Sequence, residues 1–215
     1  IVPTLTFLAT ANAARYVGAE VTFADVSASD GLMGHEHLTQ ALARCPQPPQ
    51  VIFNVHLNGQ CADPQAIAEI AGKSGAVVIE DACHALGTTY RSADGTTQEI
   101  GSCRHSLMAV FSFHAVKAMT MGEGGAITTN DPQTYERLRL LRSHGMTREA
   151  GDFQHTMLAF DHGGQPNPWY YEMSEMGYNY RATDFQCALG LSQLKKLERL
   201  NGRRRALAAT YDRLF

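Results

Sequence analysis

The most constraining feature of this sequence is a series of short apolar segments that alternate with helical patterns. Five segments are predicted to be strands: Val21–Val26, Val51–His56, Ala76–Ala82, Leu107–Phe113 and Ala126–Asn130. The middle ones are apolar almost throughout, which is typical of strands buried on both faces of a parallel sheet that helices cover. The pattern therefore predicts a three-layer α/β/α fold with a mostly parallel sheet.

The predicted helices lie between these strands. Four of them are Ala9–Val17, Leu38–Ala43, Pro64–Gly72 and Pro132–Arg142. Asp63 and Asp131 each precede a proline, so the aspartate is predicted to cap the helix that the proline begins. A long helix is predicted from Thr183, with a leucine stripe that is interrupted at Asn201–Gly202. The stretch Gly145–Pro168 has no periodicity and is predicted to be a long irregular segment, which in a compact domain is usually functional.

The composition excludes several classes of protein. With 44% hydrophobic and 18% charged residues, the chain is globular rather than disordered. The 18 basic and 21 acidic residues nearly balance, which argues against binding of nucleic acid through a basic face. No apolar run approaches the roughly 18 residues that a membrane span needs. The five cysteines form no C-x-x-C pair and the histidines have no metal-ligand spacing, so we expect free thiols in the cytoplasm and no metal site.

A carboxylate follows one of the buried strands. In VVIEDACHALG the strand ends at Glu80-Asp81, and ligands of open α/β sheets bind beyond the carboxyl ends of the strands. A buried carboxylate needs a partner, because an unpaired charge in an apolar site is costly. A protonated heterocyclic nitrogen would be such a partner for Asp81. The alternative is that Asp81 caps the turn that follows it.

A lysine follows another buried strand. In FSFHAVKAMTMGEGG the strand ends near Ser112, and Lys117 lies before a glycine-rich turn. Desolvation lowers the pKa of an ammonium group and exposes the neutral amine that Schiff-base chemistry requires. Ser112 could donate to a phosphate, and the alternative for Lys117 is a solvated loop lysine. Together, Asp81 and Lys117 are the pair that a pyridoxal phosphate (PLP) enzyme needs, one for the ring nitrogen and one for the aldehyde.

These segments and several others resemble one family. The matching blocks, in the order that the family has them, are PTLTFLATANAARYVGAEVTFADV, VIEDACHALGTTY, FSFHAVKAMTMGEGGAITTND, LRSHGM and YNYRATDFQCALGLSQLKKL. They resemble the DegT/DnrJ/EryC1/StrS sugar aminotransferases, which are fold-type-I PLP enzymes. Three segments are most similar to one branch, the UDP-4-amino-4,6-dideoxy-N-acetyl-β-L-altrosamine transaminases of pseudaminic acid biosynthesis. These segments are FSFHAVKAMTMGEGGAITTND, LRSHGM and PWYYEMSEMGYNYR.

The resemblance implies a role for each residue of a cofactor site. Lys117 matches the Schiff-base lysine, and Asp81 matches the carboxylate that pairs with the pyridine nitrogen. His84 stands where many members have glutamine, which contacts the phenolic oxygen of the cofactor. Phe7 matches the aromatic residue that stacks on the ring. Ser112 matches the hydroxyl that contacts the phosphate.

The resemblance also implies partners. Asn179 matches an asparagine that reaches the cofactor phosphate from the neighbouring subunit, which implies a homodimer with shared active sites. His56 and Arg181 fall in blocks that line the substrate side. The implied substrates are a UDP-linked 4-keto-6-deoxy sugar and an amino donor, glutamate.

The resemblance predicts how the chain is divided. The phosphate-binding loop that family members have upstream is absent, and the chain begins at Ile1 and ends within a helical pattern, so we expect an internal piece of a longer protein. Residues 1–200 would be the PLP-binding large domain without its N-terminal part. Residues 201–215 would begin the connection to a small C-terminal domain. The fragment alone is expected to be inactive.

Two other functions stay open at this point. A pyridoxamine-dependent sugar dehydratase of the same superfamily would resemble this chain, but those members have histidine in place of Lys117. A non-catalytic cofactor-binding or scaffold protein is the other alternative, against which the intact set of Asp81, Ser112 and Lys117 argues. The run Arg203-Arg204-Arg205 is most simply a solvated helix face.

Overall fold

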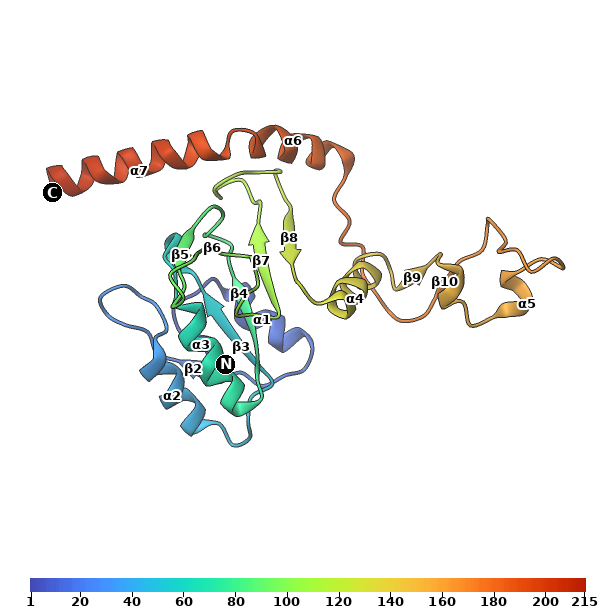
Figure 1. Ribbon diagram of the computed structural model, residues 1–215, viewed down its shortest axis with the longest axis horizontal. Coiled ribbons are helices and arrows are strands. Elements are labelled where there is room, and N and C mark those ends of the chain that lie inside the picture. Colours follow the sequence, from blue (N-terminus) through green and yellow to red (C-terminus); the bar gives the residue numbers. More distant parts are fainter. The chain divides into compact units, whose positions relative to one another are not determined.

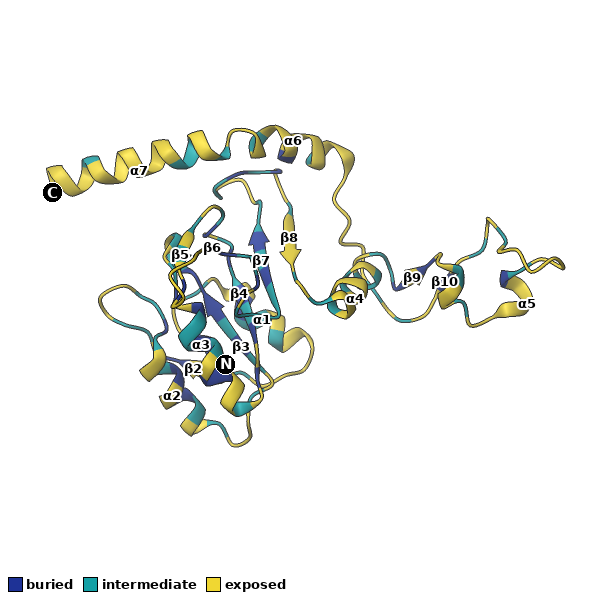
Figure 2. Ribbon diagram, viewed as in Figure 1, coloured by how far each residue is buried: buried dark blue, intermediate teal, exposed yellow.

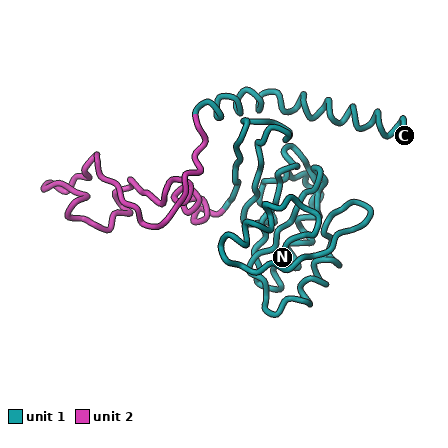
Figure 3. The backbone as a smooth tube through the Cα atoms, turned by 180° about the vertical axis from the view of Figure 1, so that it is seen from behind, with its two compact units in different colours: residues 1–130, 184–215 teal, residues 131–183 magenta.

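The chain is organised as two compact units. The computed structural model describes residues 1–215, of which residues 1–130 and 184–215 form the first unit and residues 131–183 the second (Figure 3). The predicted boundary between residues 200 and 201 falls inside an unbroken helix, α7 (Leu197–Leu214). None of the helices is both long enough and apolar enough to cross a membrane.

The first unit contains the sheet (Figure 1). Its central part has four strands in the order β3 (Val51–Val55), β4 (Val77–Asp81), β7 (Met108–Ser112) and β8 (Gly125–Thr128). The first three are parallel and β8 is antiparallel to β7. A parallel pair, β1 (Val2–Pro3) and β2 (Phe23–Ala24), continues the sheet, because the Phe53 amide donates to the Ile1 carbonyl at 2.9 Å. The sheet is therefore mostly parallel, as predicted, and each predicted strand is present in a shorter form.

Helices connect these strands. They are α1 (Leu8–Tyr16), α2 (His35–Arg44) and α3 (Pro64–Ser74), with a short 3-10 turn η1 (Leu57–Gly59) and a hairpin of β5 (Thr89–Arg91) and β6 (Thr97–Glu99). Helices α6 (Asp184–Leu194) and α7 follow the last strand of the chain. The cap predicted for α3 is confirmed, since the Asp63 side chain accepts from the Ala66 amide at 3.1 Å. The single long helix predicted from Thr183 is present as two helices, because it breaks between Leu194 and Leu197. Gly202, where the leucine stripe is interrupted, lies within α7.

The two faces of the sheet differ in burial (Figure 2). Ile52 of β3 and Val78 of β4 are buried on one face, in a core with residues of α2 and α3 such as Leu38 and Ile67. Side chains alternate along a strand, so the intervening residues point to the other face, where Val77 is 40% exposed. The prediction of strands buried on both faces is thus corrected. Apolar composition indicates that a face can be buried, but it does not specify what covers it.

The second unit holds the segment that lacks periodicity. Its elements are α4 (Pro132–Arg142), β9 (Met146–Thr147), η2 (Ala150–Asp152), α5 (Thr156–Ala159) and β10 (Glu172–Met173), and β9 and β10 pair antiparallel. The predicted cap of α4 is confirmed, because the Asp131 side chain accepts from the Thr134 amide at 2.7 Å. The ring of Phe153 packs edge-on against Tyr170, with centroids 4.9 Å apart. The predicted irregular segment therefore has a small core of its own.

A buried polar cluster joins β3 to β4. His56 is fully buried, and its Nε2 donates to the carboxylate of Glu80 at 2.9 Å, while its Nδ1 accepts from the Ala62 amide at 3.1 Å. Because Nδ1 accepts, the proton of the neutral ring is on Nε2. Ser106 donates to the other oxygen of Glu80. The His56 amide also donates to the Asp81 carbonyl at 3.0 Å, so the cluster fixes the ends of both strands.

We expect His56→Ala to lower the free energy of unfolding by about 3 kcal/mol, because it removes a donor from a buried carboxylate and leaves the Ala62 amide without its acceptor. The measurement is urea-induced unfolding of the purified protein. The matched control is His35→Ala, since His35 is exposed and its side chain makes no hydrogen bond. Equal stability of the two variants would contradict this role of His56.

Candidate functional site

The carboxyl ends of β4 and β7 bring together four of the eight residues predicted for the site. Asp81 ends β4 and Ser112 ends β7, and the register pairs Asp81 with Val110. Because side chains alternate along a strand, Asp81, Val110 and Ser112 point to the same face. The loop after β4 carries His84, and the loop after β7 carries Lys117. These four residues therefore lie at one edge of the sheet.

Asp81 has two partners within the chain. One carboxylate oxygen accepts from the Thr10 hydroxyl at 2.7 Å and the other from the Cys83 amide at 3.2 Å. The bond from the Cys83 amide caps the turn after β4, which is the alternative role that the sequence allows for Asp81. A carboxylate has about four acceptor positions, so Asp81 can accept from a further donor. Thr10 was not predicted; its only sequence signal is its place three residues after Phe7, on the same side of α1.

His84 is a neutral donor between two charges. Its Nδ1 accepts from the Asn58 amide at 3.2 Å, which leaves the ring proton on Nε2. Burial, followed by the nearby Lys117 ammonium, lowers the pKa of His84, and the Asp81 carboxylate opposes this only in part. The Lys117 ammonium makes no hydrogen bond or ion pair. His84 thus offers an N–H group next to an unpartnered lysine.

Cys83 lies in the same turn but is not a nucleophile. Burial and the neighbouring Asp81 carboxylate raise the pKa of the Cys83 thiol to about 12. The thiolate is the reactive form of cysteine, and at this pKa it is nearly absent at neutral pH. This leaves Lys117 as the candidate nucleophile at this edge of the sheet.

A pocket of about 450 Å³ adjoins the site. It is lined by Lys117 and His84, and on its other side by Asn201, Arg204 and Arg205 of α7. Arg204 donates to the Ala118 carbonyl at 3.0 Å and to the Lys117 carbonyl at 3.5 Å. The expectation that this arginine run is only a solvated helix face is therefore corrected for Arg204, which holds the lysine loop.

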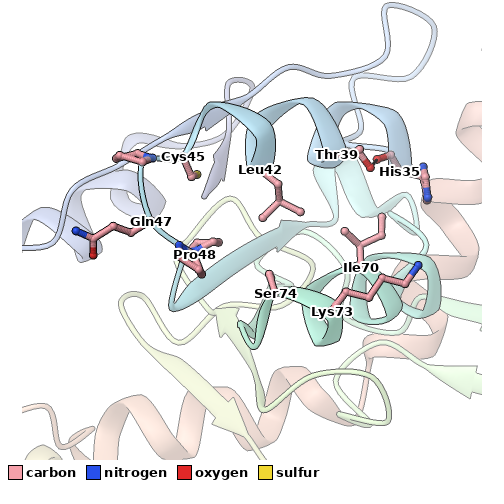
Figure 4. Close-up of a pocket in the computed structure, with 11 residues that line it drawn as sticks. His35, Thr39, Leu42, Cys45, Gln47, Pro48, Ile70, Lys73 and Ser74 are labelled. Carbon is pink, nitrogen blue, oxygen red and sulfur yellow. Dashed lines mark hydrogen bonds between the residues drawn. The ribbon is translucent and has the colours of Figure 1, made fainter.

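A second pocket, of about 530 Å³, holds none of the predicted site residues. It lies between α2 and α3, and Figure 4 shows Leu42 of α2 and Ile70 and Lys73 of α3 along it. The prolines that follow α2 close one side. We assign no function to it.

The remaining predicted residues are placed differently. Phe7 precedes α1 and its side chain is 71% exposed, so its ring is available for stacking. His56 is placed in the core: it has no exposed surface, and Glu80, its partner, points to the face opposite Asp81. With both ring nitrogens bonded, His56 has no atom to offer a substrate and is a structural residue here. Asn179 and Arg181 are exposed and belong to the second unit and its link to α6.

Two curated relatives are similar to almost the whole chain. One is the UDP-4-amino-4,6-dideoxy-N-acetyl-β-L-altrosamine transaminase of Campylobacter jejuni, which is 35% identical over 98% of this chain and 50% of its own length. The other is the spore coat polysaccharide biosynthesis protein SpsC of Bacillus subtilis, also 35% identical, over 98% of this chain and 49% of its own length. The chain thus spans about half the length of the curated relatives it matches.

Solved structures agree with this similarity. Helicobacter pylori PseC, an aminotransferase of pseudaminic acid biosynthesis, superposes with a TM-score of 0.82 at 31% identity, over 100% of this chain and 50% of its own. Spr1654 of Streptococcus pneumoniae, solved in a PLP-form, gives a TM-score of 0.79 at 28% identity, over 98% of this chain and 52% of its own. The model of one family matches residues 1–215 without a gap at either end. The chain belongs to the DegT/DnrJ/EryC1/StrS aminotransferase family.

Proposed function

We propose that the protein that contains this chain is a PLP-dependent aminotransferase. It would move an amino group from glutamate to a UDP-linked 4-keto-6-deoxy sugar, in pseudaminic acid or related nucleotide-sugar biosynthesis. The observation that carries the proposal is the unpartnered ammonium of Lys117 at the sheet edge that also holds Asp81 and His84. The names of the relatives in Campylobacter jejuni and Helicobacter pylori support the pathway.

The residues at this edge fit the cofactor. Asp81 has acceptor positions left for a pyridinium N–H, and His84 has an Nε2–H for the phenolic oxygen. The Ser112 hydroxyl accepts from the His114 amide at 3.3 Å, which leaves its proton for a phosphate oxygen. The exposed ring of Phe7 suits stacking on a flat ligand. The ring nitrogen, the phenolic oxygen and the phosphate of the cofactor therefore each have a suitable hydrogen-bond donor or acceptor on this chain.

The roles of the residues follow from their chemistry. When bound, PLP supplies an aldehyde that exchanges amino groups and a ring that accepts electrons. Lys117 holds the aldehyde and carries protons on Nζ in both half-reactions. Asp81 keeps the pyridine nitrogen protonated, because an adjacent anion favours the charged form. Thr10 and the Cys83 amide orient the carboxylate of Asp81 for this role.

The sugar dehydratase alternative is less well supported. Dehydratases of this superfamily use histidine at the position of Lys117, whereas amino transfer requires a lysine, because its neutral amine carries out the Schiff-base chemistry. The non-catalytic alternative is also less well supported, since Asp81, Ser112 and Lys117 are all present on the chain. The five free cysteines support the proposal of a cytoplasmic enzyme.

We propose further that two copies of the chain share the active sites. Asn179 would reach the partner's cofactor phosphate, and Arg181 would line the substrate side. The rings of Tyr178 and Tyr180 stack at 4.9 Å, as expected for residues on one side of an extended chain, which places Asn179 on the other side. Trp169 is 66% exposed and Tyr180 is 72% exposed, and exposed aromatics of this kind are enriched at interfaces.

Lys117 is expected to be the only lysine that binds the cofactor. The chain has four lysines, of which Lys73, Lys195 and Lys196 are the others. Borohydride reduction of the full-length protein with PLP, followed by peptide mapping, should place the cofactor mass on Lys117 alone. Lys117→Arg is the control and should carry no label on this chain. Label on another of the four lysines would contradict the assignment.

Asp81→Asn is expected to leave the protein folded and to lower turnover by about 100-fold or more, as when one preorganised charge is removed from an active site. The pyridine nitrogen would lose the anion that keeps it protonated. Steady-state kinetics measures the turnover, and circular dichroism checks that the variant is folded. Asp63→Asn is the matched control, because asparagine caps a helix as well as aspartate does. Near-wild-type rates for Asp81→Asn would return Asp81 to its capping role alone.

Complementation tests the shared site. Full-length Lys117→Ala and Asn179→Ala chains, mixed and refolded, should regain activity, because one of the two hybrid sites then contains both native residues. A mixture of Lys117→Ala and Asp81→Asn is the control and should stay inactive, since both residues come from the same subunit. No recovery in a preparation shown to contain heterodimers would refute the model.

A further inference from the structure

The pocket beside Lys117 has an unbalanced charge. Three basic residues line it, Lys117, Arg204 and Arg205, and no aspartate or glutamate does. None of the three has a carboxylate within ion-pair distance. Positive charges around one pocket repel one another, and a bound anion relieves that repulsion. No carboxylate lines the pocket, so the pocket is suited to an anionic ligand.

Hydrogen bonds from α7 to the neighbouring loops fix the shape of this pocket. Asn201, Arg204 and Arg205 are spaced i, i+3 and i+4, which places them on one side of α7. Asn201 donates to the Leu86 carbonyl at 3.1 Å, and Arg204 donates to the Ala118 carbonyl at 3.0 Å. These bonds attach α7 to both loops of the site. They also fix the guanidinium of Arg204, which still has unused donors among its five N–H groups.

Arg205, unlike Arg204, has no hydrogen-bond partner. Its guanidinium has no hydrogen bond or ion pair within the chain, although it lines the same pocket. A planar guanidinium with all its donors free matches the paired oxygens of a phosphate or a carboxylate. His84 adds no charge of its own, because its Nδ1 accepts from the Asn58 amide, which leaves a single proton on the ring.

We propose that Arg204 and Arg205 bind an anionic oxygen group of a substrate next to Lys117. This proposal rests on the proposed transaminase function. Two substrates of that reaction carry such a group: the diphosphate of the nucleotide-linked sugar and the carboxylates of the amino donor. Arg205 makes the direct contact. Arg204 contributes its charge and holds α7 against the lysine loop.

The test compares Arg205→Gln with Arg203→Gln in the full-length protein. Arg203 is one residue from Arg204 on the same helix and is exposed, but it does not line the pocket. The two variants therefore lose the same charge from the same helix. KM is measured separately for the nucleotide sugar and for glutamate. Binding of UDP alone and of glutamate alone is measured by calorimetry, and cofactor retention by absorbance.

We expect Arg205→Gln to raise one of the two KM values about tenfold or more, as when a charged hydrogen bond is lost, and Arg203→Gln to change neither. A rise for the nucleotide sugar, with weaker UDP binding, assigns the pocket to the diphosphate. A rise for glutamate assigns it to the carboxylate. Equal constants in both variants would overturn the proposal, as would loss of cofactor from Arg205→Gln, which would assign the anion to the cofactor phosphate.

The calorimetry separates this proposal from the proposed function. If the wild-type protein transfers no amino group but binds UDP or glutamate in a manner that depends on Arg205, the transaminase function fails and the anion site remains. If transamination proceeds and neither ligand depends on Arg205, the anion site fails and the function remains.

Discussion

The structure depends on one property of an extended chain: neighbouring residues of a strand point to opposite faces of the sheet. At the end of β4 two carboxylates are adjacent, and this alternation separates them. Glu80 is buried with His56 and Ser106 beneath the sheet, while Asp81 points to the face where α1 supplies Thr10. One carboxylate thus stabilises the strand ends, and the other is left with acceptor positions for chemistry.

This separation also explains how the two faces cooperate. The His56 amide donates to the Asp81 carbonyl, so the buried pair holds the backbone from which the Asp81 side chain projects. The η1 turn that follows His56 supplies the Asn58 amide to His84. A defect in the buried cluster therefore affects the geometry of Asp81 and His84 together, although neither residue contacts the cluster through its side chain.

Much of this arrangement could be predicted from sequence. Apolar runs located β3, β4 and β7, and the Asp-Pro pairs at Asp63 and Asp131 located two helix starts, because both signals are local. The sheet-edge positions of Asp81, Ser112 and Lys117 followed from the strand ends. The burial of His56 and the contacts of Arg204 could not be predicted in this way, since each depends on a residue far along the chain, as Arg204 does on Ala118. Alternation along the strand places Glu80 and Asp81 on opposite faces, so the different roles of these two carboxylates can be predicted from sequence.

The attachment of helix α7 to the loop that carries Lys117 has a consequence for the position of this lysine. The helix is continuous through Gly202, and from Arg204 to Leu214 it extends about 15 Å at the usual rise per residue (Figure 1). Arg204 donates to the backbone carbonyls of Ala118 and Lys117 near the middle of this helix. Because the guanidinium binds the backbone of this loop, a displacement of α7 would move the Lys117 peptide with it. The position of Lys117 therefore depends on where α7 lies and not only on the side chains around the pocket.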